Sequence, residues 1–294
     1  MALHIRRQVS LGLVIGSRAF FSPARCKTAR DEVTAQLARL GIDVVTLPFE
    51  ATANGAVQSI PDAELYARHF KANRDRIDGL VICLPNFGDE IAIAELVSRA
   101  RLNVPILLQA SNDEVDKVDV HSRRDALCGK LSVTNTFWQY GVPFTETTSH
   151  TCDTGGAEFD ADLDRFARVC RTVKGLRGAR PGAIGARTAA FQTMHYGEKL
   201  RQAAGITMVT VDLSEMMGAA GAIPDGDPDL SVKRDKIKAC GTIPAHKPAQ
   251  ILTQAKWPLA VNRWTLANGC DAPPSSARAA RRTISAAPPA SPCR

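Results

Sequence analysis

The chain has 294 residues, of which 45% are hydrophobic and 23% charged, with a formal net charge of +7. This is the composition of a soluble globular protein with room for two domains. Residues 272–294 hold four arginines and no acid. The rest of the chain carries only about +3, which argues against a nucleic-acid partner. No stretch approaches the roughly 18 apolar residues of a membrane helix, so no membrane association is expected.

The cysteines and histidines form no recognisable ligand set. The eight cysteines include no CxxC pair and no zinc spacing, and the six histidines are isolated, with no HxxxH or HExxH. We therefore assign no catalytic and no metal-ligating residue. Unpaired thiols such as Cys83, which lies inside an apolar run, are typical of proteins in a reducing cytosol, so we predict a cytoplasmic protein.

The N-terminus allows two interpretations. MALHIRRQ followed by VSLGLVIG and SRA resembles a signal peptide with a small-residue cleavage site. The same apolar run also fits a first buried strand over residues 9–15. We favour the strand, because the elements that follow use it as the start of a repeated unit.

Residues 1–152 are predicted to form a first α/β domain. Apolar runs alternate with segments of helical periodicity, which is the signature of a doubly wound parallel sheet of the Rossmann-like or flavodoxin-like kind. The predicted strands are 9–15, 42–47, 78–85, 104–110 and 143–149, and the predicted helices are 24–40, 61–73, 91–101 and 124–140.

Residues 153–270 are predicted to be a second, incomplete α/β domain, with Gly155-Gly156 marking the boundary and Asp160 as an N-cap. The predicted elements are helices at 160–176, 196–204 and 229–238 and strands at 179–186 and 206–216. Residues 250–264 keep helical features, although Pro258 would kink or break a helix there.

The tail, residues 271–294, is not expected to join a core. Alanine, proline, serine and arginine make up 20 of the 23 residues from 272 to 294. The segment is either a flexible tail or the product of a shifted reading frame, and both interpretations end the folded region near residue 270.

Two loops that follow predicted strands carry candidate ligand-binding residues, because ligands of parallel sheets meet the carboxyl ends of the strands. GSRAFF offers Arg18, whose fixed donors suit hydroxyls or acids, and Phe20 and Phe21 as apolar faces. LPNFGDE offers Asn86. The alternatives are a solvated arginine, phenylalanines that close the sheet edge, and an acidic residue of LPNFGDE that caps the next helix.

Residues 128–144, CGKLSVTNTFWQYGVPF, bring amides close to aromatic residues. Asn135 and Trp138 are candidates for binding a polyol, since rings pack on C–H faces and amides bind hydroxyls. The alternative is an amphipathic helix whose aromatic residues belong to the core.

Several ordered motifs resemble L-fucose isomerase-like proteins, relatives of the L-fucose and L-arabinose isomerases. They are IGSRAFF, LPNFGDE, RRDALCGKLSVTNTFWQYGVPF, DLDRFARVCRTVKGLR, GAIGARTAAFQTMHYGEKL and VTVDLSE. The resemblance covers roughly residues 10–240 and implies two amino-terminal domains with Rossmann-like sheets. It also implies an aldose–ketose isomerase that uses Mn²⁺ and moves a proton between C1 and C2 of a monosaccharide.

The resemblance further implies a homo-oligomer in which the first domain covers a neighbour's sugar site, with Arg18 and Phe20 or Phe21 over the substrate. The family's metal ligands are expected beyond about residue 275, but no Asp, Glu or His follows Asp271. We therefore expect a fragment without its C-terminal catalytic part and of doubtful activity alone. A sugar-binding module of the periplasmic-binding-protein type and a plain oligomerisation scaffold remain as alternatives.

Overall fold

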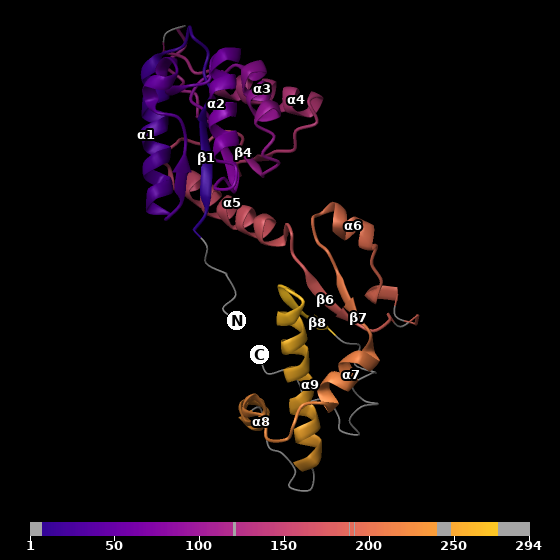
Figure 1. The fold of residues 1–294 in the computed structure, drawn as a ribbon. Helices are drawn as coiled ribbons and strands as arrows, with labels where there is room; N and C mark the ends of the chain where they lie inside the picture. Colours follow the sequence, from indigo (N-terminus) through magenta and orange to yellow (C-terminus); the bar gives the residue numbers. More distant parts are fainter. Residues whose placement is uncertain (1–7, 120–121, 188, 191, 240–247, 276–294) are drawn as a thin grey trace. The chain divides into compact units, whose positions relative to one another are not determined.

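The computed structural model describes residues 8–119, 122–187, 189, 190, 192–239 and 248–275 (Figure 1). The chain divides into two compact units, Met1–Lys174 and Gly175–Arg294. Among the residues described, no helix is long and apolar enough to cross a bilayer.

The first unit is built on a sheet of five parallel strands in the order β2-β1-β3-β4-β5. The strands are β1 (Ser10–Ile15), β2 (Asp43–Val45), β3 (Gly79–Leu84), β4 (Ile106–Ala110) and β5 (Thr145–Glu146). This is the flavodoxin-like order, and it confirms the predicted doubly wound α/β fold. All six residues of β3 are buried, as expected for a central strand covered on both faces.

Helices cover both faces of this sheet (Figure 1). On one face Leu11, Leu13 and Ile15 pack with α1 (Pro23–Arg39) and α5 (Ala157–Leu176). On the other, the intervening Val14 packs with α2 (Ile60–Ala72), α3 (Glu90–Ala100) and α4 (Ala126–Gln139). The alternation of side chains along a strand explains why one apolar run supplies both cores.

Helix α5 belongs to the first unit. Its residues Phe159, Leu163, Phe166 and Cys170 are buried in the same core as α1. The predicted boundary between residues 152 and 153 would have assigned this helix to the second domain. Asp160, expected as its N-cap, lies inside the helix, which begins at Ala157.

The second unit has a three-stranded parallel sheet in the order β7-β6-β8. Its strands are β6 (Pro181–Ile184), β7 (Val209–Val211) and β8 (Ala272–Ser275), and its helices are α6 (Glu198–Ala203), α7 (Leu213–Gly221), α8 (Pro228–Ala239) and α9 (Pro248–Ala267). The order, with the first strand in the centre, is again that of a Rossmann-like half-sheet.

Three details of the second unit differ from expectation. Residues 213–216, predicted as strand, open α7, because the Asp212 carboxylate caps the helix by accepting from the Ser214 N–H at 2.7 Å. Helix α9 continues through Pro258 without a break. Ala272–Ser275 of the expected tail pairs with β6, while residues 276–294 lie outside the described part of the chain.

Candidate functional site

The carboxyl edge of the first sheet gathers the loops that follow β1, β3 and β4. The chain leaves β1 toward β2 on one side and returns through α2 to β3 on the other. The loops after β1 and β3 therefore diverge at the topological switch point, where parallel sheets bind ligands. The two loops predicted to carry site residues, residues 16–22 and 85–89, both lie here.

Arg18 is held between these two loops. Its Nε donates to the Gly88 carbonyl oxygen at 2.6 Å, and its Nη2 donates to Glu90 Oε2. The guanidinium carbon lies 4.5 Å from the centroid of the Phe87 ring, a cation–π contact. Among the described residues no acceptor binds the three remaining guanidinium hydrogens. The Nε hydrogen and one Nη2 hydrogen therefore position Arg18, and the other three hydrogens can donate to a ligand.

Glu90 stays ionised beside Arg18. Burial by itself raises the pKa of the Glu90 carboxyl, but the Glu90 backbone N–H and the Arg18 guanidinium outweigh burial and hold the pKa below its ordinary value. Asp89, not Glu90, caps α3: its Oδ1 accepts from the Ala92 N–H at 2.8 Å. The ionised Glu90 therefore partly neutralises the positive charge of Arg18 before any ligand binds.

Asn86 is fully buried and joins the two loops. Its Oδ1 accepts from the Arg18 N–H at 3.3 Å and the Gly88 N–H at 3.2 Å, and its Nδ2 donates to Ser17 Oγ at 2.8 Å. The LPNFGDE motif predicts Asn86 as a sugar contact. In the structure its side-chain amide bonds to Ser17, Arg18 and Gly88 of the two loops, so Asn86 positions the backbone of Arg18.

The two phenylalanines have different surroundings. Phe21 is buried, whereas Phe20 is 57% exposed, and their ring centroids lie 4.5 Å apart. Phe21 therefore supports Phe20 from the core side. Of the two, Phe20 is the ring that can meet the C–H face of a sugar.

Asn135 and Trp138 lie elsewhere. Both are exposed, in the last turns of α4. Because β5 is parallel to β4 and begins shortly after α4 ends, this end of α4 lies at the opposite, amino edge of the sheet. The structure brings Arg18, Phe20, Phe21 and Asn86 together and leaves Asn135 and Trp138 apart from them. The core aromatic of this helix is Phe137.

A cleft of about 370 Å³ at the same carboxyl edge was not anticipated from the sequence. Its lining comes from α1, the segment between β4 and α4, and the loop before α5. The lining residues are Ala24, Arg25, Thr28, Ala29, Glu32, Ser111, Arg124, Asp153 and Thr154. These segments are far apart in the chain. The one sequence feature that could have indicated the cleft is that residues 111–123 follow a predicted strand, and so lie at its carboxyl end.

Two arginines at this cleft are tied to one carboxylate. Glu114 Oε1 accepts from Arg25 Nη1 at 2.8 Å and from Arg124 Nη2 at 3.3 Å. Hydrogen bonds from Lys117 and Arg25 lower the pKa of the Glu114 carboxyl to about 2. Arg124 also reaches the Pro85 carbonyl at 3.4 Å, which connects the cleft to the loop of Asn86.

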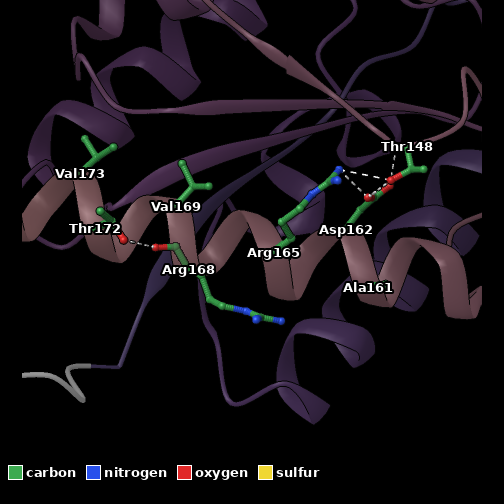
Figure 2. A pocket seen from close by; sticks show the side chains of 8 residues that line it. All are labelled: Thr148, Ala161, Asp162, Arg165, Arg168, Val169, Thr172 and Val173. Atoms are coloured by element: carbon green, nitrogen blue, oxygen red, sulfur yellow. Dashed lines mark hydrogen bonds and ion pairs between the residues drawn. The ribbon is translucent and has the colours of Figure 1, made fainter. Parts of the chain in front are cut away.

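A second cleft, of about 590 Å³, runs along α5 (Figure 2). Figure 2 shows Thr148 and Arg165 converging on Asp162. The buried Asp162 carboxylate accepts from the Thr148 N–H, the Thr148 hydroxyl and Arg165 at 2.7–2.8 Å. Its polar groups satisfy one another, so this cleft is a weaker candidate than the sheet edge.

The residues described offer no group of three or more His, Cys, Asp or Glu side chains that could hold a metal ion. The donor set for Mn²⁺, expected from the resemblance, is therefore not found in this part of the chain, and we derive no step through a metal.

A family model, fucose/sulfoquinovose isomerase, N-terminal domain, matches residues 12–177, which is more than half of the chain. The chain belongs to the fucose/sulfoquinovose isomerase family. The match covers the sheet of the first unit except the first two residues of β1, together with all the helices of that unit and both loops that hold Arg18. The family that the motifs indicated is thereby confirmed, and it is a family of sugar isomerases.

The remaining comparisons add little. The search of curated proteins found no match. Among solved structures, an ABC transporter periplasmic solute binding protein from Actinobacillus succinogenes 130z with bound D-allose matches at 13% identity and a TM-score of 0.27, covering 89% of this chain and 76% of that chain. A superposition this loose supports no conclusion about fold or ligand.

Proposed function

We propose that the first unit is the sugar-covering domain of an aldose–ketose isomerase. The observation on which this rests is the position of Arg18 within the matched family domain. It lies at the switch point of the sheet, and three of its guanidinium hydrogens have no acceptor among the described residues. Hydroxyl oxygens of a monosaccharide would accept from these donors, and Phe20 would pack on its C–H face. The reaction moves a proton between C1 and C2 of the sugar through an enediol.

The described residues contribute binding and coverage to this function. Glu90 and the Gly88 carbonyl oxygen orient the guanidinium, which lies over the Phe87 ring. Asn86 holds the backbone N–H of Arg18. We propose that the metal ligands and the base of the isomerase belong to other residues, and that this unit closes over the site of a neighbouring copy in a homo-oligomer. The six described cysteines are all unpaired, which supports a cytosolic location.

Ligand-observed NMR on the intact chain tests the binding. We would titrate deoxy-hexoses and pentoses, including L-fucose and L-arabinose, into the unaltered protein, Arg18→Ala and Arg18→Lys. The matched control is Arg168→Ala, which removes an arginine from the cleft along α5. We expect weak sugar binding that Arg18→Ala abolishes, Arg18→Lys restores only in part and Arg168→Ala leaves intact. Equal binding by all four proteins would contradict the assignment of Arg18.

A parallel assay for conversion of the same sugars with added Mn²⁺ separates coverage from catalysis. Binding without conversion is the expected result for the chain alone. Conversion of a sugar would show that the chain itself supplies the metal site. That result would contradict the proposal that the described residues contribute only binding and coverage.

A further inference from the structure

The cleft of about 370 Å³ at the carboxyl edge of the first sheet follows one face of α1. The residues that α1 contributes to it include Arg25, Ala29 and Glu32. Ala29 and Glu32 lie four and seven residues after Arg25, so all three are on the same side of the helix. The rise of an α-helix separates Arg25 from Glu32 by about 10 Å along its axis. The cleft therefore has two ends, and the two ends differ in charge.

The end at Arg25 is basic. Arg25 and Arg124 donate to Glu114 Oε1 at 2.8 and 3.3 Å. Lys117 pairs with the same carboxylate, so three cations share one anion and positive charge is in excess. The two arginine side chains are only 14% and 21% exposed, and each also donates to a backbone carbonyl oxygen. A ligand would therefore meet guanidinium groups that are already ordered.

The end at Glu32 is acidic. Asp153 also lines the cleft, and the hydroxyl of the next residue, Thr154, donates to Glu32, which places both carboxylates at this end. Asp153 accepts from the Asn112 N–H at 3.2 Å and from the Asn112 Nδ2 at 3.0 Å. In the part of the chain that the structure describes, neither carboxylate forms an ion pair. The partners of Glu32 and Asp153 are neutral, so the negative charge of this end is not compensated.

Small and hydroxyl-bearing residues complete the lining. Thr28 and the buried Ala29 lie between the two ends on α1, and Ser111 faces them from the loop after β4. Ser111 is 1% exposed, and its Oγ accepts from Gln109 Nε2 at 3.5 Å. Among the described residues no acceptor receives the hydrogen of the Ser111 hydroxyl. A buried donor without an acceptor is destabilising, and a ligand that accepts from Ser111 would remove this penalty.

We propose that this cleft binds a small zwitterion, a molecule that carries a carboxylate and an ammonium group several bonds apart. Its carboxylate would accept from the two arginines, and its ammonium group would donate to Glu32 and Asp153. ω-Amino acids and dipeptides have this chemistry. An inorganic anion would pair only with the basic end and a simple amine only with the acidic end, and each would be repelled by the charge at the other end.

The dimensions of the cleft suit such a ligand. Its volume of about 370 Å³ is near the lower limit of small-molecule sites, as a ligand of amino-acid or dipeptide size requires. The separation of about 10 Å between Arg25 and Glu32 favours charges that are farther apart than those of an α-amino acid. Arg18 is not among the described lining residues, so the proposed sugar site and this cleft can each fail alone.

Ligand-observed NMR titration of the intact chain tests the binding. The probes are γ-aminobutyrate, ε-aminocaproate and glycylglycine, which are the long zwitterions of the set. Butyrate and butylamine match γ-aminobutyrate with one charge removed, and glycine is a zwitterion whose charges are close together. We expect at least one long zwitterion to bind at least about tenfold more tightly than butyrate, butylamine and glycine, because only a long zwitterion pairs with both ends.

Three results would overturn the proposal. The first is that no long zwitterion binds at the highest soluble concentration. The second is that butyrate or butylamine binds as tightly as the long zwitterions, which would mean that one end of the cleft acts alone. The third is that inorganic phosphate or L-fucose binds in the cleft more tightly than any zwitterion, which would make it an anion site or a sugar site.

Substitutions test the two ends separately. Glu32→Gln keeps the shape of the side chain and should weaken binding of the long zwitterion at least about tenfold, while butyrate binds at least as well as before. Arg25→Gln should weaken binding of both. Asp31→Asn is the matched control, since Asp31 is the neighbouring carboxylate on α1, pairs with Lys27 and does not line the cleft. It should bind like the unaltered protein.

Circular dichroism identifies variants that have lost their fold. Asp153→Asn removes a charge from the same end as Glu32→Gln, so it gives a second measurement of the acidic end and should have the same effect. If folded Glu32→Gln and Asp153→Asn bound the long zwitterion as tightly as Asp31→Asn, the acidic end would play no part in binding and the proposal would be wrong.

Discussion

Arg18 and Glu90 connect the loops that follow β1 and β3, with the guanidinium Nη2 donating to the carboxylate Oε2. The two side chains are only 30% and 23% exposed, and they are separated by 72 residues in the chain. The pair therefore fixes both the spacing of the two loops and the direction of the remaining donors of Arg18.

Glu90→Gln should lower the free energy of unfolding by about 1 kcal/mol at neutral pH, a modest value because the ion pair is partly solvated. The pKa of Glu90 is lowered in the folded protein. Its stabilisation is therefore full above the ordinary carboxyl pKa and lost as the pH falls below it. Urea unfolding of both proteins should give a difference that shrinks in acid. A difference that grows in acid would contradict the sign.

Asn86→Ala should weaken sugar binding and destabilise the fold, whereas Arg18→Ala should mainly weaken binding. Removing the buried amide leaves the Gly88 and Arg18 N–H groups and the Ser17 hydroxyl without their partner, at a cost of about 1–3 kcal/mol. Urea unfolding and NMR titration of both variants measure the two effects. If Asn86→Ala left stability unchanged, the positioning role would be wrong.

Gly129→Ala should destabilise the first unit by about 1–3 kcal/mol or more. A Cβ on Gly129 would lie 1.8 Å from the Phe87 carbonyl oxygen, so α4 would have to move away from the loop under Arg18. Gly175→Ala is the control, because nothing lies within 4 Å of a Cβ there and alanine favours a helix. Chemical denaturation should show opposite signs for the two substitutions.

Glu114→Gln should lower the thermal midpoint at neutral pH, and this effect should shrink steadily as the pH falls toward 2. Hydrogen bonds from Lys117 and Arg25 depress the pKa of this carboxyl to about 2, so its contribution is full above the ordinary pKa of about 4.3 and is lost as the pH falls through about 2. Scanning calorimetry across this range checks the window. Asp116→Asn, an exposed carboxylate of the same loop without an ion pair to any described residue, should show no such change.

The sequence alone predicted the first sheet, because buried parallel strands such as β3 are short unbroken apolar runs and the helices between them repeat every three or four residues. It also predicted that the loops holding Arg18 and Asn86 share an edge, since all parallel strands end on the same side. The amphipathic pattern of α5 was visible as well.

Only the tertiary structure decided which sheet α5 covers, because an apolar stripe does not specify its partner. The same holds for the site. Long-range contacts decide the partners of its side chains. Asn86 bonds to Ser17 and Glu90 pairs with Arg18. Glu114 likewise accepts from both Arg25 and Arg124. Trp138 looked like a ligand contact from its neighbours in the chain, yet its exposure depends on which side of α4 faces the core. Periodicity records where a chain is buried, whereas side-chain partners are set by how the buried faces come together.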